Sequence, residues 1–137
     1  MEYNIFVWKP EMSVNEIKID FQHRQLLNQV NIVLSELINR IEPAAVKRAV
    51  DFLSEYINSH LKYEEEYMLA NSYPDLPIHR SAHQDFITHY EEFKNRFEGG
   101  ANPNELAMEI EQYIGNWWIH HIGEIDKKYA EYIASKK

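Results

Sequence analysis

Two histidines lie one helical turn apart in the segment HRSAH, at positions 79 and 83. Residues four positions apart on an α-helix point in nearly the same direction, so His79 and His83 can bind one metal ion. The segment HLKYE repeats this spacing with a carboxylate, because Glu64 follows His60 by four residues. Each spacing permits chelation, although a single short motif is weak evidence because such motifs recur by chance.

Two further segments carry the same residue types. His23 lies between Ile19 and Leu27, on an apolar stripe. In HIGEID, His121 and Asp126 are five residues apart, which on an α-helix separates them by about 140°. That angle is too wide for close chelation of one ion, and it suits two ions side by side with Asp126 reaching between them. The chain has no cysteine, so the available ligands are imidazole and carboxylate, a set that suits iron, zinc, copper or manganese.

The elements that must position these residues are long helices. Glycines and prolines are few and lie between segments in which apolar residues recur every three or four positions. These segments predict helices over residues 17–41, 43–70, 78–97 and 103–133, preceded by an arm at 1–16 whose aromatic residues we expect to cover one end or side of the bundle. Four helices with short links predict a single all-α domain over 1–137, an antiparallel up-down-up-down four-helix bundle.

Every predicted helix contributes a histidine or a carboxylate to its apolar stripe, and this convergence favours a metal site. A lone histidine on such a stripe is more often a hydrogen-bonded core residue, and Glu64 and Asp126 taken alone could be ordinary surface charges. An unliganded cluster of this kind, however, would leave many buried polar groups to satisfy. His89 and His120 are rotated away from the ligand faces and are not expected to bind metal.

Charge and composition exclude several function classes. The formal net charge of −8 opposes binding to nucleic acids and to anionic lipid surfaces. The N-terminal sequence lacks the pattern of a signal peptide, and charged or polar residues interrupt every apolar run before it reaches membrane-spanning length. We therefore expect a cytoplasmic protein without a membrane span and without a nucleic-acid partner.

Four segments together resemble the hemerythrin family, and specifically the single-domain bacteriohemerythrins: IDFQH (19–23), HLKYEEEYM (60–68), YPDLPIHRSAH (73–83) and WWIHHIGEID (117–126). The resemblance implies a four-helix bundle with a non-haem diiron centre, bridged by an oxo or hydroxo group, that binds O2 reversibly. By position it implies three histidines at one iron, two at the other and two bridging carboxylates: His79, His83 and His121; His23 and His60; and Glu64 and Asp126. The iron of His23 and His60 is then one ligand short, and O2 is expected to bind there.

A dry pocket around this position is expected from five large apolar residues: Trp117, Trp118, Ile122, Leu61 and Phe86. Plain core packing explains the same residues equally well. Two of them depart from the family pattern, which usually has phenylalanine at Leu61 and leucine at Trp118. If both positions line one pocket, the smaller residue makes room for the larger.

The function expected from the resemblance is O2 carriage, storage or delivery by a protein that is not an enzyme. Small anions such as azide are expected to bind at the same position. The alternatives are a diiron enzyme acting on peroxide, O2 or nitric oxide, and an iron-storage protein. We expect a monomer that serves an oxygen-consuming partner.

Overall fold

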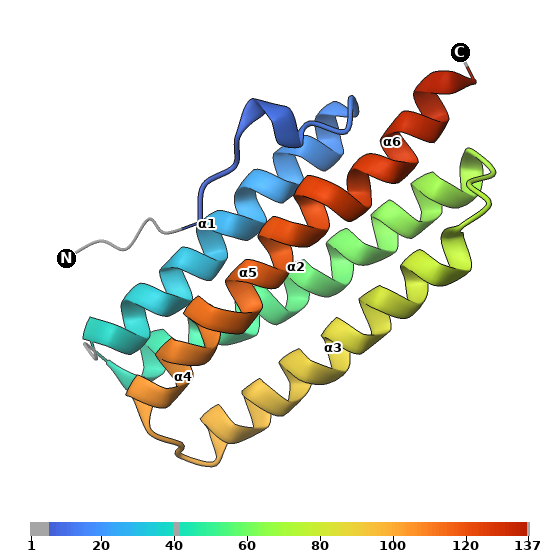
Figure 1. Cartoon of the computed structure of the whole chain (residues 1–137). Helices are drawn as coiled ribbons and strands as arrows, with labels where there is room; N and C mark the ends of the chain where they lie inside the picture. Colours follow the sequence, from blue (N-terminus) through green and yellow to red (C-terminus); the bar gives the residue numbers. More distant parts are fainter. Residues whose placement is uncertain (1–5, 40–41, 137) are drawn as a thin grey trace.

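The computed structural model describes residues 6–39 and 42–136, and it is a bundle of four long helices (Figure 1). The first three are α1 (Ile17–Asn39), α2 (Pro43–Ala70) and α3 (Leu76–Glu98). The fourth runs from α4 (Pro103–Glu109) through α5 (Gly115–His120) to α6 (Asp126–Ser135). The predicted all-α four-helix bundle is confirmed. No helix in the described part of the chain is long and apolar enough to cross a membrane.

The helix ends follow local chemistry. A proline stands in the first turn of α2, α3 and α4, where its missing N–H costs no helical hydrogen bond. The side chain of Asn102 caps α4 by accepting a hydrogen bond from the backbone N–H of Asn104 at 2.7 Å. α2 has the predicted bounds, and α3 begins two residues earlier than predicted, at Leu76. The end predicted for the first helix, Ile41, lies outside the described residues.

Two short π-helical segments interrupt the fourth helix, η2 (Ile110–Ile114) and η3 (His121–Ile125). In each segment a backbone N–H bonds to the carbonyl five residues earlier, from Gly115 to Ile110 and from Asp126 to His121. The uninterrupted α-helix that the sequence predicts is therefore wrong in these two turns. Such π segments occur frequently at functional sites, because the wider turn redirects the side chains that follow it.

The bundle has two apolar clusters with a polar layer between them. The larger cluster includes Leu53, Phe86 and Trp118, and the smaller includes Met68 and Tyr129. In each helix the histidines and carboxylates lie between a residue of the smaller cluster and a residue of the larger one: Ile19, His23 and Leu26; Met68, Glu64, His60 and Ile57; Leu76, His79, His83 and Phe86; Tyr129, Asp126 and Ile122. Each large apolar side chain contributes about 1.5–3 kcal/mol by burial, which holds the polar layer in place.

The described part of the N-terminal arm, residues 6–16, includes the 3-10 turn η1 (Pro10–Met12) and packs along the bundle (Figure 1). The backbone N–H of Phe6 donates to Asn31 Oδ1, and the Asn31 amide donates to the Phe6 carbonyl. The Phe6 ring fills the space over Gly115, where an added Cβ would lie 2.0 Å from it. Lys127 Nζ donates to the carbonyl of Ser13 at 2.9 Å. The arm thus ties α1 to the fourth helix.

Candidate metal centre

The structure brings together all seven residues that the sequence predicts as ligands, and none of them is more than 3% exposed. His23 comes from α1, His60 and Glu64 from α2, His79 and His83 from α3, and His121 and Asp126 from the fourth helix. Their ligand atoms form two groups. We call His79, His83 and His121 the three-histidine group, and His23 and His60 the two-histidine group.

Glu64 directs one carboxylate oxygen to each group. Its Oε1 lies 3.2 Å from Nε2 of His83 and 3.4 Å from Nε2 of His79. Its Oε2 lies 3.2 Å from Nε2 of His23 and 3.5 Å from Nε2 of His60. A carboxylate in this position can bridge two metal ions.

Asp126 repeats the arrangement from the fourth helix. Its Oδ1 lies 3.0 Å from Nε2 of both His79 and His121, and its Oδ2 lies 3.1 Å from Nε2 of His23. The separation of about 140° expected between His121 and Asp126 is wrong, because the two side chains approach to 3.0 Å. The π-helical turn η3 places residues five apart on the same face, whereas an α-helix would separate them.

The spacing of the nitrogen and oxygen atoms in the cluster suits coordination of a metal ion better than hydrogen bonding among these atoms. Nε2 of His121 lies 3.1 Å from Nε2 of both His83 and His79. Two nitrogens bound at right angles to one ion, each about 2.1 Å from it, are about 3.0 Å apart. Among the described residues, four ligand atoms have no hydrogen-bond partner: His60 Nε2, Glu64 Oε1, and Oδ1 and Oδ2 of Asp126. Buried polar atoms rarely stay unpaired, and cations bound in the two groups would satisfy all four.

The electrostatics of the cluster point the same way. Burial lowers the pKa of His60 to about 3, so this ring is neutral, as a ligand must be. Burial also lowers the pKa of His23 and His79, but contacts with the two carboxylates outweigh it and raise both pKa values to about 9. Burial and Glu64 raise the pKa of Asp126, yet the neighbouring imidazoles hold it well below its usual range. A bound metal would therefore take the place of protons on His23 and His79.

Hydrogen bonds behind the ligands orient them. Nδ1 of His60 donates to Gln22 Oε1 at 2.8 Å, and Nδ1 of His83 donates to Glu65 Oε2 at 2.8 Å. The hydroxyl of Tyr129 donates to Glu64 Oε2 at 3.0 Å. Sequence reasoning missed Gln22, Glu65 and Tyr129, because a polar residue beside a ligand has no spacing that distinguishes it from a surface residue.

The five residues predicted to line an O2 pocket occupy different places. Trp118 is fully buried, and its ring centroid lies 5.9 Å from that of His60 and 6.1 Å from that of His121. Trp117 is half-buried and stacks on His121 at 4.4 Å, beside the three-histidine group. Phe86 packs against both tryptophans, and Leu61 and Ile122 are buried in the same apolar cluster. Trp118 is thus the aromatic ring that packs against both groups.

The other two histidines pair outside the cluster. Nε2 of His89 lies 3.0 Å from Oε1 of Glu109, and its ring stacks on Tyr113. His120 forms an exposed ion pair with Glu124, one helical turn later. Neither histidine belongs to the two groups of ligand atoms.

The fold and the site define a class of protein, the helical bundles that hold metal in the core between facing helices. The family profile described as "Hemerythrin HHE cation binding domain" matches residues 17–133. This match covers most of the chain, and the chain belongs to the hemerythrin family.

Relatives of similar length support the assignment. The bacteriohemerythrin of Clostridium acetobutylicum is 30% identical over 130 residues, covering 93% of this chain and 100% of the relative. The bacteriohemerythrin of Stenotrophomonas maltophilia is 29% identical over 131 residues, covering 96% and 83%. Among solved structures, a wild-type hemerythrin aligns with a TM-score of 0.81 at 22% identity, covering 95% of this chain and 98% of that one. At that identity the structural match shows the common fold alone.

Proposed function

We propose that this chain binds O2 reversibly at a centre of two iron ions, for oxygen carriage, storage or delivery. The observation that carries the proposal is the arrangement of Glu64 and Asp126, each of which offers one oxygen to the three-histidine group and the other to the two-histidine group. Two ions side by side use these four oxygens fully. A single ion in the two-histidine group would leave Oε1 of Glu64 and Oδ1 of Asp126 buried without a partner, and a single ion in the three-histidine group would leave Oδ2 of Asp126 without one.

The residues present suit iron. Imidazole is a ligand type that suits iron, carboxylates are harder oxygen ligands that iron also accepts, and the family profile is that of a cation-binding domain. The proposed ligands are His79, His83 and His121 for one ion and His23 and His60 for the other, with Glu64 and Asp126 shared. Two iron ions held by these residues would supply the two electrons that reversible O2 binding needs.

The chain itself supplies the asymmetry and the dry surroundings. The two-histidine group offers one nitrogen fewer, so its ion keeps a position for a small molecule or an anion such as azide. Trp118 packs against His60 there, and Phe86 packs against Trp118. These buried apolar rings exclude water, which protects a bound molecule from proton-driven loss.

The test is repeated exposure to O2. Protein loaded with iron(II) without air should take up one O2 per two irons and release it under vacuum, with the same absorption change over many cycles. Rapid oxidation that vacuum does not reverse would contradict O2 carriage and would favour the enzyme. Uptake of many more than two irons per chain would favour storage. Zinc-loaded protein, which should take up no O2, is the control.

A further inference from the structure

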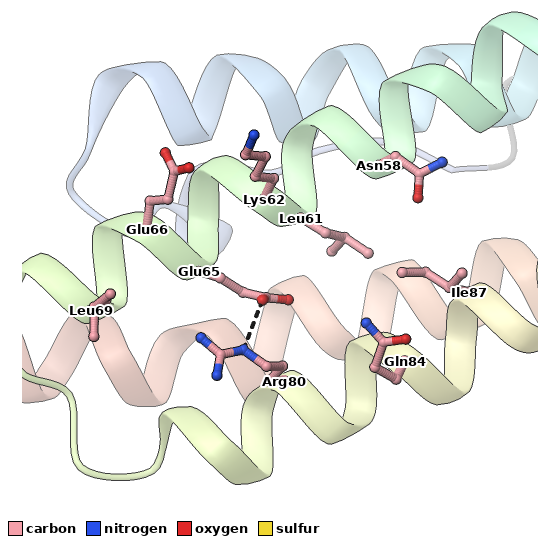
Figure 2. A pocket seen from close by; sticks show the side chains of 9 residues that line it. All are labelled: Asn58, Leu61, Lys62, Glu65, Glu66, Leu69, Arg80, Gln84 and Ile87. Atoms are coloured by element: carbon pink, nitrogen blue, oxygen red, sulfur yellow. Dashed lines mark hydrogen bonds and ion pairs between the residues drawn. The ribbon is translucent and has the colours of Figure 1, made fainter.

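Three side chains, those of His83, Glu65 and Arg80, connect the three-histidine group to the protein surface, and Figure 2 shows the last two. His83 is fully buried, and its Nδ1 donates to Oε2 of Glu65 at 2.8 Å. The other oxygen of Glu65, Oε1, accepts from Nε of Arg80 at 3.0 Å. The side chain of Glu65 is 19% exposed and that of Arg80 is 48% exposed. Both line a surface pocket between α2 and α3, so the partly exposed side chain of Glu65 links the buried His83 to solvent.

The orientation of the His83 ring fixes what Glu65 can do. Nε2 of His83 points into the cluster, 3.2 Å from Oε1 of Glu64, so its ring hydrogen lies on Nδ1. A carboxylate that accepts this hydrogen makes the imidazole a stronger electron donor through its other nitrogen. The matching bond in the two-histidine group runs from His60 to the neutral amide of Gln22. A charged side chain therefore accepts the ring hydrogen of His83 in the three-histidine group, and an uncharged side chain accepts that of His60 in the two-histidine group.

Arg80 acts on the same carboxylate in the opposite direction. Its positive charge draws electron density from Glu65 and weakens Glu65 as an acceptor for His83. Glu65 and Arg80 should thus have effects of opposite sign on the metal, even though they are partners in one ion pair.

We propose that Glu65 is a positioning residue that acts through His83 to strengthen metal binding at the three-histidine group and to lower its reduction potential, and that Arg80 moderates this effect. The inference rests on the proposed diiron centre. It adds that two residues of the pocket between α2 and α3, Glu65 and Arg80, determine how readily the iron at the three-histidine group is oxidised.

The first experiment measures the reduction potential of the iron-loaded full chain in four variants. Glu65→Gln keeps an acceptor but removes the charge, and should raise the potential by about 59 mV, a tenfold change in the oxidation equilibrium for one electron. Arg80→Gln should lower the potential by a smaller amount. Glu66→Gln and Lys62→Gln remove the same charges from exposed residues of the same pocket and should leave the potential nearly unchanged.

Two results would overturn the proposal. Shifts of the same sign in Glu65→Gln and Arg80→Gln would show that the pair only holds the helices together. Shifts no larger than those of Glu66→Gln and Lys62→Gln would show only the general effect of charge.

A loss of about tenfold in metal affinity is expected for Glu65→Gln alone, since outer partners of metal ligands typically contribute 10–100-fold.

A second experiment separates this inference from the proposed function. In the zinc-loaded protein, which performs no O2 chemistry, nuclear magnetic resonance of the imidazole N–H of His83 reports its hydrogen bond. We expect this resonance to lie far downfield in the unsubstituted chain, to move upfield in Glu65→Gln and to move further downfield in Arg80→Gln. Unchanged resonances would reject the role of Glu65, whether or not the iron-loaded protein binds O2.

Discussion

The three-histidine group and the two-histidine group share Glu64, Asp126 and the packing of Trp118, yet they differ in their number of rings and in their outer partners. One has three rings, an outer carboxylate at His83 and the stacked ring of Trp117. The other has two rings, an outer amide at His60 and a buried nitrogen, Nδ1 of His23, without a hydrogen-bond partner among the described residues. In the proposed centre the shared carboxylates would hold two ions together, while unequal numbers of rings and unequal outer partners would give the two ions different tasks.

The largest effect is expected from Glu64→Ala, which removes the residue that both groups share. Both positions should lose metal, with a loss in affinity above the 10–100-fold typical of an outer partner. The iron content of the purified variant measures this, and His120→Ala, which changes an exposed histidine, should keep the full content. Two irons retained in Glu64→Ala would show that the groups do not depend on a common bridge.

Removal of one ring should separate the two groups. His60→Ala leaves the two-histidine group with a single imidazole, while the three-histidine group keeps all of its nitrogens. We expect about one tightly bound metal ion per chain instead of two, measured by metal analysis after dialysis against a weak chelator. Loss of both ions would mean that the three-histidine group cannot hold metal independently.

The tryptophans should differ because Trp118 packs against both groups and Trp117 stacks on the three-histidine group alone. Trp118→Leu should leave a cavity beside His60, reduce the free energy of unfolding by about 2–4 kcal/mol and speed azide binding to the oxidised protein. Trp117→Leu changes a half-buried ring and should affect the azide rate less. Stopped-flow absorption and chemical denaturation measure the two effects. Equal azide rates in both variants would remove Trp118 as the residue that limits access.

The smallest effect should come from making the two groups more alike. Gln22→Glu puts a carboxylate next to Nδ1 of His60, as Glu65 lies next to Nδ1 of His83. The metal affinity of the two-histidine group should rise by roughly threefold. This gain is below the usual range for an outer partner because solvent screens the new charge at a half-buried position. Gln25→Glu, a half-buried position on the same helix, controls for added charge. Competition with a metal-binding dye measures the affinity, and equal gains in both variants would argue against a role for the hydrogen bond.

The sequence predicts the four helices from the spacing of apolar residues, and it predicts the seven clustered residues from local spacing together with the resemblance of four segments to the hemerythrin family. His79 with His83, and His60 with Glu64, follow from one turn of an α-helix. The contact between His121 and Asp126 could not be predicted, because the π-helical turn that produces it leaves no periodic signal. The hydrogen bond between Glu65 and His83 depends on how α2 packs against α3. The contact of the Phe6 ring with Gly115 joins residues more than 100 positions apart. Such tertiary contacts are not encoded in any local pattern.

The most direct test of two unequal metal positions is anomalous diffraction at the iron edge from crystals of the iron-loaded, oxidised chain soaked in azide. Two iron peaks are expected between the four helices, both in contact with Glu64 and Asp126, with azide on the iron bound by His23 and His60. A single iron peak, or azide on the iron bound by His79, His83 and His121, would contradict this account.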